Sequence, residues 1–183
     1  YWGENKAGAS PYLISCNNPL ASQGLVPAYV SLVEDQCSYA NNLMPVSNKR
    51  PRGQRKSFLV CWRGANFDDD ISLQVIEWAE ILKLFELDTV IVYVEKLHAN
   101  VMKVLHHYRT LGFFIVRFIK FPHQFPNQRS ENFLQWLQSD LVSYHDAFYE
   151  NLYLYEFMIP MDVDEFIMPL FDEDRTWHDL VRR

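Results

Sequence analysis

The sequence predicts an α/β domain in which helices flank a mostly parallel β-sheet. From residue 58 onward, apolar runs of strand length alternate with segments in which apolar residues recur at helical spacing. Such alternation is typical of right-handed βαβ units. The run at 89–94 is β-branched and apolar on both faces, as a central parallel strand is. Residues 1–57 are richer in turn-forming residues, so we expect a loop- and β-rich N-terminal extension with a linker there, and the domain itself at 58–183.

The elements of this domain can be assigned in chain order. Strands are expected at 58–62, 89–94, 113–118 and 157–161, and helices at about 71–85, 101–111 and 131–149. The first helix carries a second apolar stripe (Leu73, Ile76 and Leu84), which predicts a helix packed deep in the layers. Gly112 is expected at the C′ position that ends the second helix. In the extension, short strands are expected at 12–14 and within 28–33.

Composition excludes several classes of protein. The chain has 183 residues, of which 49% are hydrophobic and 22% charged, so it can bury a core. Its net charge of −6 argues against nucleic acid as a partner, because phosphate binding needs clustered Lys and Arg. Its apolar runs are too short to span a bilayer, and no signal-peptide pattern opens it. Because the chain starts at Tyr1 in ordinary sequence, we expect it to be part of a longer protein or a processed form.

The cysteine content leaves two interpretations open. The chain has 3 cysteines, Cys16, Cys37 and Cys61, and none of them forms a CxxC pair, which argues against a zinc knuckle. All three can be small buried hydrophobic side chains. Alternatively, two of them form a disulfide in a lumenal or secreted protein and one thiol is left over.

The candidate functional residues follow the ends of the predicted strands, where open parallel sheets bind their ligands. They are Arg63 after the first strand, Glu95 after the second, and Asp162 with Asp164 after the last. The run Asp162-Val163-Asp164-Glu165 is the strongest signal, because clustered carboxylates repel one another unless a cation or donor groups compensate. Two aspartates spaced by one residue point the same way if the strand conformation continues. Together they can hold Mg²⁺ or Mn²⁺, which prefer oxygen ligands and leave positions for a diphosphate.

Simpler roles exist for the acidic and histidine residues. The segment 162–165 can be a solvated turn after a strand. Asp-x-Asp is also the nucleophile motif of haloacid-dehalogenase-like phosphatases, but those enzymes have Thr or Val where this chain has Phe166. The acidic run at 68–70 suits the start of a helix. Of the 6 histidines, only His145 and His178 lie near the acidic segment in sequence, as a ligand or a base.

Five separated segments of the chain have the order and spacing of one known family. They are 76–85, 90–93, 104–112, 144–151 and 162–169, and the last of them, DVDEFIMP, is similar to the motif DIDEFIxP. Residues 58–169 therefore resemble glycosyltransferase family 92, a group of Golgi-type enzymes with the GT-A fold. The extension fits the family more loosely, through 11–16 and 30–32.

The resemblance implies transfer of a hexose, typically galactose, from a UDP-sugar to a glycan acceptor with inversion. It implies Mn²⁺ (or Mg²⁺) as cofactor, with Asp164 as the direct ligand and Asp162 facing the ribose and the water shell of the metal. Arg63 and Glu95 are then further candidates for binding the UDP-sugar. A metal there would neutralise the departing diphosphate, and a general base for the acceptor hydroxyl is expected downstream of Arg183. The family also implies the Golgi lumen, with the full-length protein held in the membrane by a segment absent from this chain.

Departures from the family pattern leave an alternative open. His145-Asp146-Ala147 stands where the family has Asn-Asp-Cys, so a partner thiol such as Cys61 would be stranded. Pro160 precedes Asp162 by two residues, which predicts a bulge or a sheet edge there. We also expect the fold to be truncated after the Asp-x-Asp strand, without its acceptor-binding half. The alternative function is therefore a non-catalytic GT-A relative, or an inactive fragment, that serves as a binding or scaffold domain.

Overall fold

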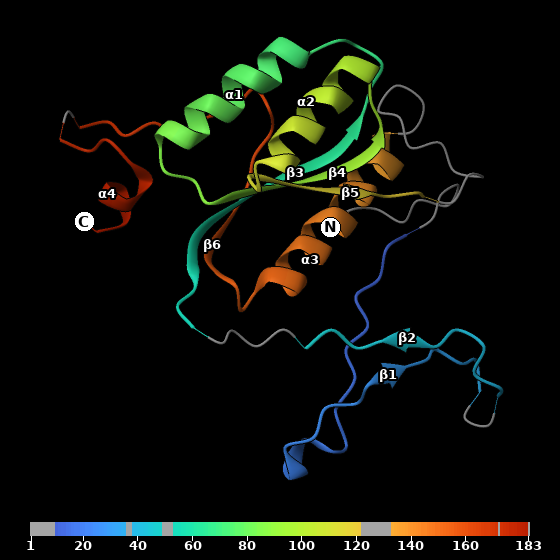
Figure 1. Cartoon of the computed structure of the whole chain (residues 1–183). Helices are drawn as coiled ribbons and strands as arrows, with labels where there is room; N and C mark the ends of the chain where they lie inside the picture. Colours follow the sequence, from blue (N-terminus) through green and yellow to red (C-terminus); the bar gives the residue numbers. More distant parts are fainter. Residues whose placement is uncertain (1–9, 36–37, 49–52, 122–132, 172, 183) are drawn as a thin grey trace.

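A four-stranded parallel sheet forms the centre of the structure (Figure 1). The computed structural model describes residues 10–35, 38–48, 53–121, 133–171 and 173–182. The strands are β3 (Lys56–Asn66), β4 (Thr89–Lys96), β5 (Phe114–Phe118) and β6 (Tyr155–Pro160), in the spatial order β5-β4-β3-β6. Each neighbouring pair is parallel, so the predicted α/β class with a parallel sheet is confirmed.

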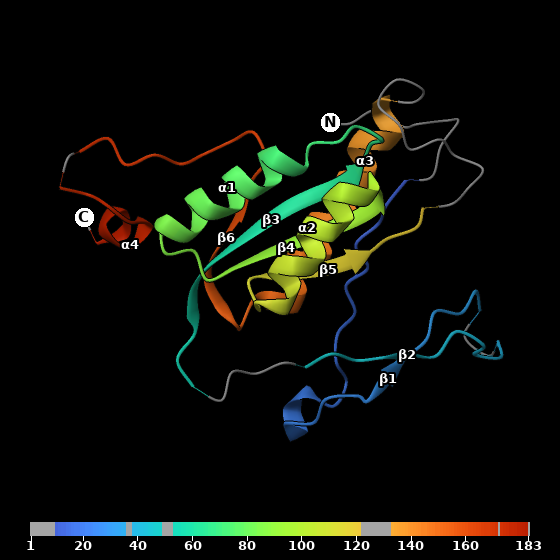
Figure 2. The ribbon, with the colours of Figure 1, turned by 45° about the horizontal axis from the view of Figure 1, so that its top comes forward.

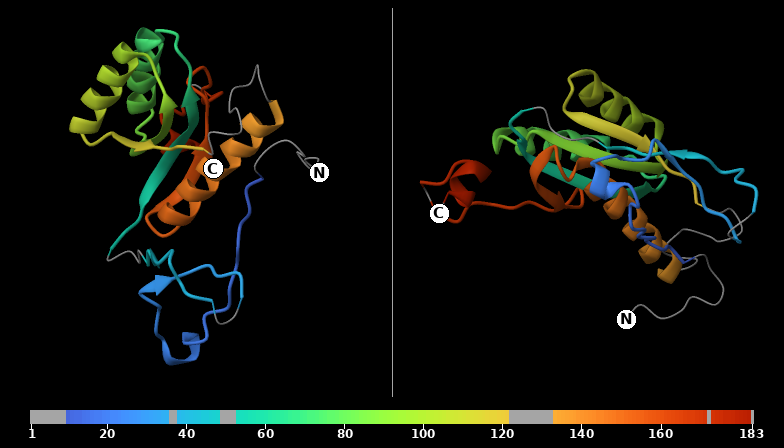
Figure 3. Two further views of the ribbon diagram at one scale, coloured as in Figure 1. Left: turned by 90° about the vertical axis from the view of Figure 1, so that its right-hand side faces the viewer. Right: turned by 90° about the horizontal axis from the view of Figure 1, so that it is seen from below.

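Helices cover both faces of the sheet. α1 (Ser72–Leu84) and α2 (Ala99–Thr110) lie on one face, and α3 (Phe133–Asn151) lies on the other (Figures 2 and 3). Right-handed crossovers explain this, because the chain moves outward to β5 over one face and returns to β6 over the other. A short helix, α4 (Trp177–Val181), follows β6. The expected start of the third helix, residue 131, lies outside the described residues. Among the helices that are described, none has the length and apolarity needed to cross a membrane.

Side chains of β3 and β4 contribute to a separate core on each face of the sheet. The larger core, beneath α1 and α2, includes Val60, Trp62, Trp78, Val92 and Leu105. The smaller core, on the α3 side, includes Leu59, Cys61, Ile91, Tyr93 and Ala147. Consecutive strand residues thus enter opposite layers, as the pleat requires. The second core is smaller because α3 buries polar side chains: Gln135, Gln138, Ser139, Asp140, Ser143 and Asn151.

The second apolar stripe of α1 is exposed, so the prediction of a deeply packed helix is wrong. Leu73 and Leu84 are 80% and 75% exposed. Burial is confined to the other stripe, formed by Val75, Trp78, Ala79 and Leu82. α1 contacts the sheet and α2 with only one of its sides, so one apolar face is enough to bury it against them. Leucines on the outer face are compatible with the helix because leucine is a strong helix former.

Local backbone features explain where several elements begin and end. Gly112 follows the C-cap residue of α2 with a φ of +74°, so the predicted glycine at the helix end is confirmed. The Asp88 carboxylate accepts the N–H groups of Ser57 and Phe58 at 2.8 and 2.9 Å, which fixes the start of β3. Pro160 ends β6, and β6 is an edge strand, so the predicted sheet edge is confirmed.

The N-terminal extension carries a small antiparallel ladder to one side of the domain (Figure 1). Its elements are the 3₁₀ helix η1 (Ala21–Gln23) and the strands β1 (Tyr29–Val30) and β2 (Met44–Pro45). Asn42 ties this ladder together, since its amide donates to the Leu32 carbonyl at 2.8 Å. β1 falls within the predicted strand at 28–33, but the prediction of a strand at 12–14 is wrong. That segment borders α3 instead of joining a partner strand.

The two described cysteines are free thiols. Cys16 is exposed and Cys61 is buried, whereas Cys37 lies outside the described residues. Burial raises the pKa of Cys61 to about 12, so this thiol stays protonated and unreactive. Cys61 is therefore a small hydrophobic side chain of the core, as the first interpretation predicts, but that interpretation is wrong for Cys16, which is exposed.

Candidate functional site

The acidic turn, residues 162–165, is fixed to the core directly after β6. The Met161 N–H donates to the Cys61 carbonyl of β3 at 3.1 Å. Asp162 and Glu165 then bond to each other twice, through the Glu165 N–H to the Asp162 carbonyl at 3.1 Å and the Asp162 N–H to Glu165 Oε2 at 3.0 Å. From α1, Trp78 Nε1 donates to the Glu165 carbonyl at 3.1 Å. The acidic turn is therefore anchored to both β3 and α1.

Strand conformation does not continue through the two aspartates. β6 ends at Pro160, and Val163 and Asp164 form the turn. Val163 packs against the larger core. The expectation that Asp162 and Asp164 point the same way depended on an extended backbone, so their surroundings have to be described one at a time.

Arg63 of β3 reaches the acidic turn and joins it to α3. Its Nε and Nη2 donate to Oδ1 and Oδ2 of Asp162 at 3.2 and 3.1 Å, which makes a bidentate pair. Its Nη1 donates to Oδ2 of Asp140, on α3, at 2.8 Å. The guanidinium lies over the ring of Trp136, with 4.9 Å between Cζ and the ring centroid. We call Arg63, Asp140 and Asp162 the arginine cluster; it brings together two of the predicted site residues.

The two acids of the arginine cluster differ in burial. Only 5% of the Asp140 side chain is exposed, against 33% of the Asp162 side chain. Burial raises the pKa of Asp140 to about 6, and the charge of Asp162 adds to the rise, although Arg63 opposes it. Burial alone would lower the pKa of Arg63, but the hydrogen bond to Asp162 and the charges of both acids outweigh it and raise that pKa. One cation is thus shared between a buried and a partly exposed carboxylate.

A metal ion would find two different carboxylates in the acidic turn. Asp164 is exposed and has no hydrogen-bond or ion-pair partner within the described ranges, whereas both oxygens of Asp162 accept from Arg63. In the part of the chain that the structure describes, no three His, Cys, Asp or Glu side chains form a group that could hold a metal. Mg²⁺ and Mn²⁺ need only one or two protein carboxylates when a diphosphate and water supply the other oxygens. The exposed carboxylate of Asp164 is therefore open to such an ion, whereas Arg63 occupies both oxygens of Asp162.

The other predicted residues lie outside the arginine cluster. Glu95 is near the carboxyl end of β4, where its Oε2 accepts a hydrogen bond from Asn66 Nδ2 at 2.9 Å. His178 of α4 packs edge-on against Phe58, with ring centroids 5.0 Å apart. His145 lies exposed on α3. Glu95 therefore lies at the same carboxyl-terminal end of the sheet as the arginine cluster, and neither histidine joins the cluster.

The acidic run at 68–70 supports the start of α1, which confirms its simpler interpretation. Asp70 accepts from the Asn100 side-chain amide at 2.7 Å and from the Ser72 N–H at 3.2 Å. These hydrogen bonds lower the pKa of Asp70 to about 2. Asp68 pairs with Lys96 at 2.7 Å, and both side chains are exposed. Protein groups thus compensate the carboxylates of Asp68 and Asp70.

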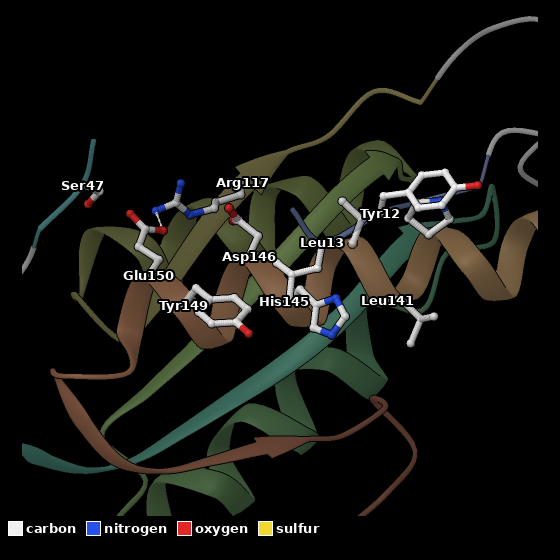
Figure 4. A pocket seen from close by; sticks show the side chains of 11 residues that line it. Tyr12, Leu13, Ser47, Arg117, Leu141, His145, Asp146, Tyr149 and Glu150 are labelled. Atoms are coloured by element: carbon white, nitrogen blue, oxygen red, sulfur yellow. Dashed lines mark ion pairs between the residues drawn. The ribbon is translucent and has the colours of Figure 1, made fainter. Parts of the chain in front are cut away.

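Two further acids of α3 bind groups on the sheet. The Tyr93 hydroxyl donates to Oδ2 of Asp146 at 2.6 Å, and Arg117 forms an ion pair with Glu150. Together with the Arg63–Asp140 bond, β3, β4 and β5 each present one donor to an acid of α3. Beside the second and third pairs is a cavity of about 580 Å³, bordered by α3 and the extension (Figure 4). Its lining includes Tyr12, Leu13, Leu141, His145 and Tyr149.

Comparison with known protein families identifies the domain. Residues 56–183 match the model of glycosyltransferase family 92. The chain belongs to glycosyltransferase family 92. Glycosyl transfer is therefore the general activity of this family 92 domain, and its helix-flanked parallel sheet agrees with a GT-A-like fold. Searches among curated proteins and among solved structures gave no match.

Asp140 is the member of the cluster that was not predicted from the sequence. It lies in the middle of α3, far from any strand end. A helix that covers a sheet normally buries an apolar stripe. α3 instead buries polar residues at helical spacing, among them Gln135, Ser139 and Ser143. A polar stripe on a sheet-covering helix is the signal that could have indicated a polar site beneath it.

Proposed function

We propose that this family 92 domain transfers a hexose, in the first place galactose, from a UDP-sugar to a glycan acceptor with inversion. The observation that carries the proposal is the arginine cluster, in which Arg63, near the carboxyl end of β3, bonds to Asp140 of α3 and to Asp162, which follows the end of β6. Ligands of open parallel sheets bind at that edge, and a guanidinium beside acidic side chains suits a diphosphate with a divalent cation. Family membership supplies the reaction class.

Arg63 is the proposed anchor for the diphosphate of the donor. Its Nε and Nη2 form an edge that fits two oxygens of a phosphate as well as the two oxygens of Asp162. Asp140 holds Nη1, and Trp136 lies against the face of the guanidinium, so this edge stays directed toward the acidic turn. Positive charge fixed at that place stabilises the negative charge that develops on the leaving UDP.

Mn²⁺ or Mg²⁺ is the proposed cofactor, and Asp162 and Asp164 are the proposed ligands. When bound, such an ion supplies Lewis-acid neutralisation of the departing diphosphate. The exposure of Asp164 supports this role, because its carboxylate does not have to give up a protein partner first. Glu95, one strand away at the same sheet edge, is proposed to contact the UDP-sugar.

The acceptor side of the reaction is a proposal from family membership alone. Inversion requires a general base on the acceptor hydroxyl, and we assign no residue of this chain to that role. We further propose that the acceptor is a glycan, that the reaction takes place in the Golgi lumen, and that the protein has no nucleic-acid partner. The anomeric configuration of the product, read by NMR after incubation with UDP-galactose and a glycan, tests inversion and the donor sugar together.

Calorimetric titration of the chain with UDP tests the donor site. We expect binding with saturating Mn²⁺ and little or none with a chelator. Asp164→Asn should weaken metal-dependent binding by about tenfold or more, since even residues behind the direct ligands commonly contribute about 10–100-fold to metal affinity. The matched control is Asp68→Asn, which removes an exposed acid from the other acidic run. Equal UDP affinity with and without Mn²⁺, or an equal loss in both variants, would overturn the proposed site.

A further inference from the structure

Arg63 divides its hydrogen bonds between two edges of the guanidinium. The Nη1 edge bonds to Asp140 at 2.8 Å, and the Nε/Nη2 edge bonds to Asp162 at 3.2 and 3.1 Å. The Asp140 contact is buried beneath α3, whereas a third of the Asp162 side chain is exposed. An incoming ligand can therefore reach Asp162 and its half of the guanidinium, but not Asp140.

The exposed edge of Arg63 can bond to a phosphate as readily as to a carboxylate. Both groups present two oxygens at the spacing that the planar N–H pair matches. The other edge and the ring face do not have to move in such an exchange, because Asp140 and Trp136 hold them. The exchange therefore breaks the bidentate pair with Asp162 and forms a bidentate pair with the phosphate, while the guanidinium of Arg63 stays in its position.

We propose that Arg63 is an exchangeable latch on Asp162. Without a donor, the latch is closed and occupies both oxygens of Asp162. When the diphosphate of the donor arrives, the Nε/Nη2 edge moves to phosphate oxygens and Asp162 becomes available to a divalent cation. Asp140 is the positioning residue that keeps Arg63 in the site in both states. The inference rests on the proposed function, since it assumes a diphosphate donor and a cation.

A second observation shows unused bonding capacity on the buried face of α3. The hydroxyl of Ser143, one helical turn after Asp140, is fully buried and has no hydrogen-bond partner among the described residues. Buried polar groups are normally satisfied, so such an atom indicates that a partner is missing or that the groups around it rearrange.

The latch couples the two ligands. A cation alone has to compete with Arg63 for Asp162, and a diphosphate alone has to compete with Asp162 for Arg63. When both bind, each removes the competitor of the other, so each ligand strengthens the binding of its partner by the same factor. Couplings of this kind typically amount to about 5–150-fold.

The test measures Mn²⁺ and UDP separately. The affinity for Mn²⁺ without nucleotide is read from the electron paramagnetic resonance signal of free Mn²⁺, for the wild type, Arg63→Met and Arg63→Lys. Because Arg63→Met removes the latch, this variant should bind Mn²⁺ without nucleotide about tenfold more tightly than the wild type does. It should bind UDP in the presence of Mn²⁺ less tightly than the wild type does. Arg63→Lys keeps a cation beside Asp140 but lacks the bidentate edge, so its Mn²⁺ affinity should rise by a smaller factor.

Control variants separate the latch from the proposed function. Arg117→Met removes another arginine that joins the sheet to an acid of α3, and it should change neither affinity. Asp140→Asn should weaken UDP binding and reduce the coupling, because Arg63 is no longer held. If the wild type binds UDP only with Mn²⁺ but neither Arg63 variant gains affinity for Mn²⁺ alone, the latch is wrong and the donor site stands. If the wild type shows no Mn²⁺-dependent UDP binding, the proposed function fails first.

Discussion

Replacement of Trp78 by Phe should loosen the acidic turn and weaken the site that depends on it. Trp78 is fully buried, its ring packs against Trp62 at 5.8 Å, and its Nε1 donates to the Glu165 carbonyl at 3.1 Å. Changing indole to phenyl removes about three ring atoms from the core, at a cost of about 2 kcal/mol. The lost hydrogen bond adds about 1 kcal/mol. We therefore expect the free energy of unfolding to fall by about 3 kcal/mol.

The assay is urea denaturation followed by far-UV circular dichroism, together with UDP titration in the presence of Mn²⁺. Trp177→Phe is the matched control, because Trp177 is also buried and its Nε1 donates to the Ile167 carbonyl at 2.9 Å, beyond the turn. Both variants should lose similar stability, but only Trp78→Phe should weaken UDP binding, by several fold. A stability loss below about 1 kcal/mol, or equal UDP affinities, would refute the claim that Trp78 anchors the turn.

Two other variants test the energetics of buried polar groups. Because burial raises the pKa of Asp140 to about 6, the folded state binds more protons than the unfolded state between about pH 4 and 6, so this carboxyl lowers stability as pH rises. Asp140→Asn removes that effect. In urea titrations, the free energy of unfolding of this variant minus that of the wild type should therefore increase by about 2–3 kcal/mol as the pH rises from about 4 to 6. A difference that does not change with pH would contradict the raised pKa of Asp140. Tyr155→Phe removes the buried hydrogen bond from the Tyr155 hydroxyl to Thr89 Oγ1, 2.9 Å long, and should cost about 1–2 kcal/mol by the same method. No loss would mean that this bond does not stabilise the fold.

The sheet and its helices could be predicted because their pattern is local. Apolar runs at 89–94 and 113–118 and the glycine after α2 follow from strand periodicity and from the conformational freedom of glycine. The predictions that failed concern burial and pairing, which depend on neighbours distant in sequence. Leu73 and Leu84 lie at helical spacing but face outward, and residues 12–14 are apolar but have no partner strand among the described residues.

The candidate site could be predicted only in part for the same reason. The rule that ligands bind beyond the carboxyl ends of parallel strands selects Arg63 and Asp162, although β3 continues past Arg63 to Asn66. It does not say that they bond to each other, because the side-chain contact spans 99 positions of sequence. Asp140 comes from a helix that the rule ignores, and it is recognised only once α3 lies on the sheet. The turn at Asp164 likewise depends on anchors from α1 and β3.

Metal-directed cleavage of the backbone tests most directly whether a cation binds at the acidic turn. Fe²⁺ replaces Mn²⁺ in the presence of UDP, and ascorbate with hydrogen peroxide then cuts the chain beside the bound ion. The fragments are identified by mass spectrometry. We expect cuts at 162–165 that excess Mn²⁺ suppresses and that Asp164→Asn abolishes. Cuts confined to 68–70 or to the α3 acids near Asp146, or cuts that Mn²⁺ does not suppress, would contradict a donor-site cation held by Asp162 and Asp164.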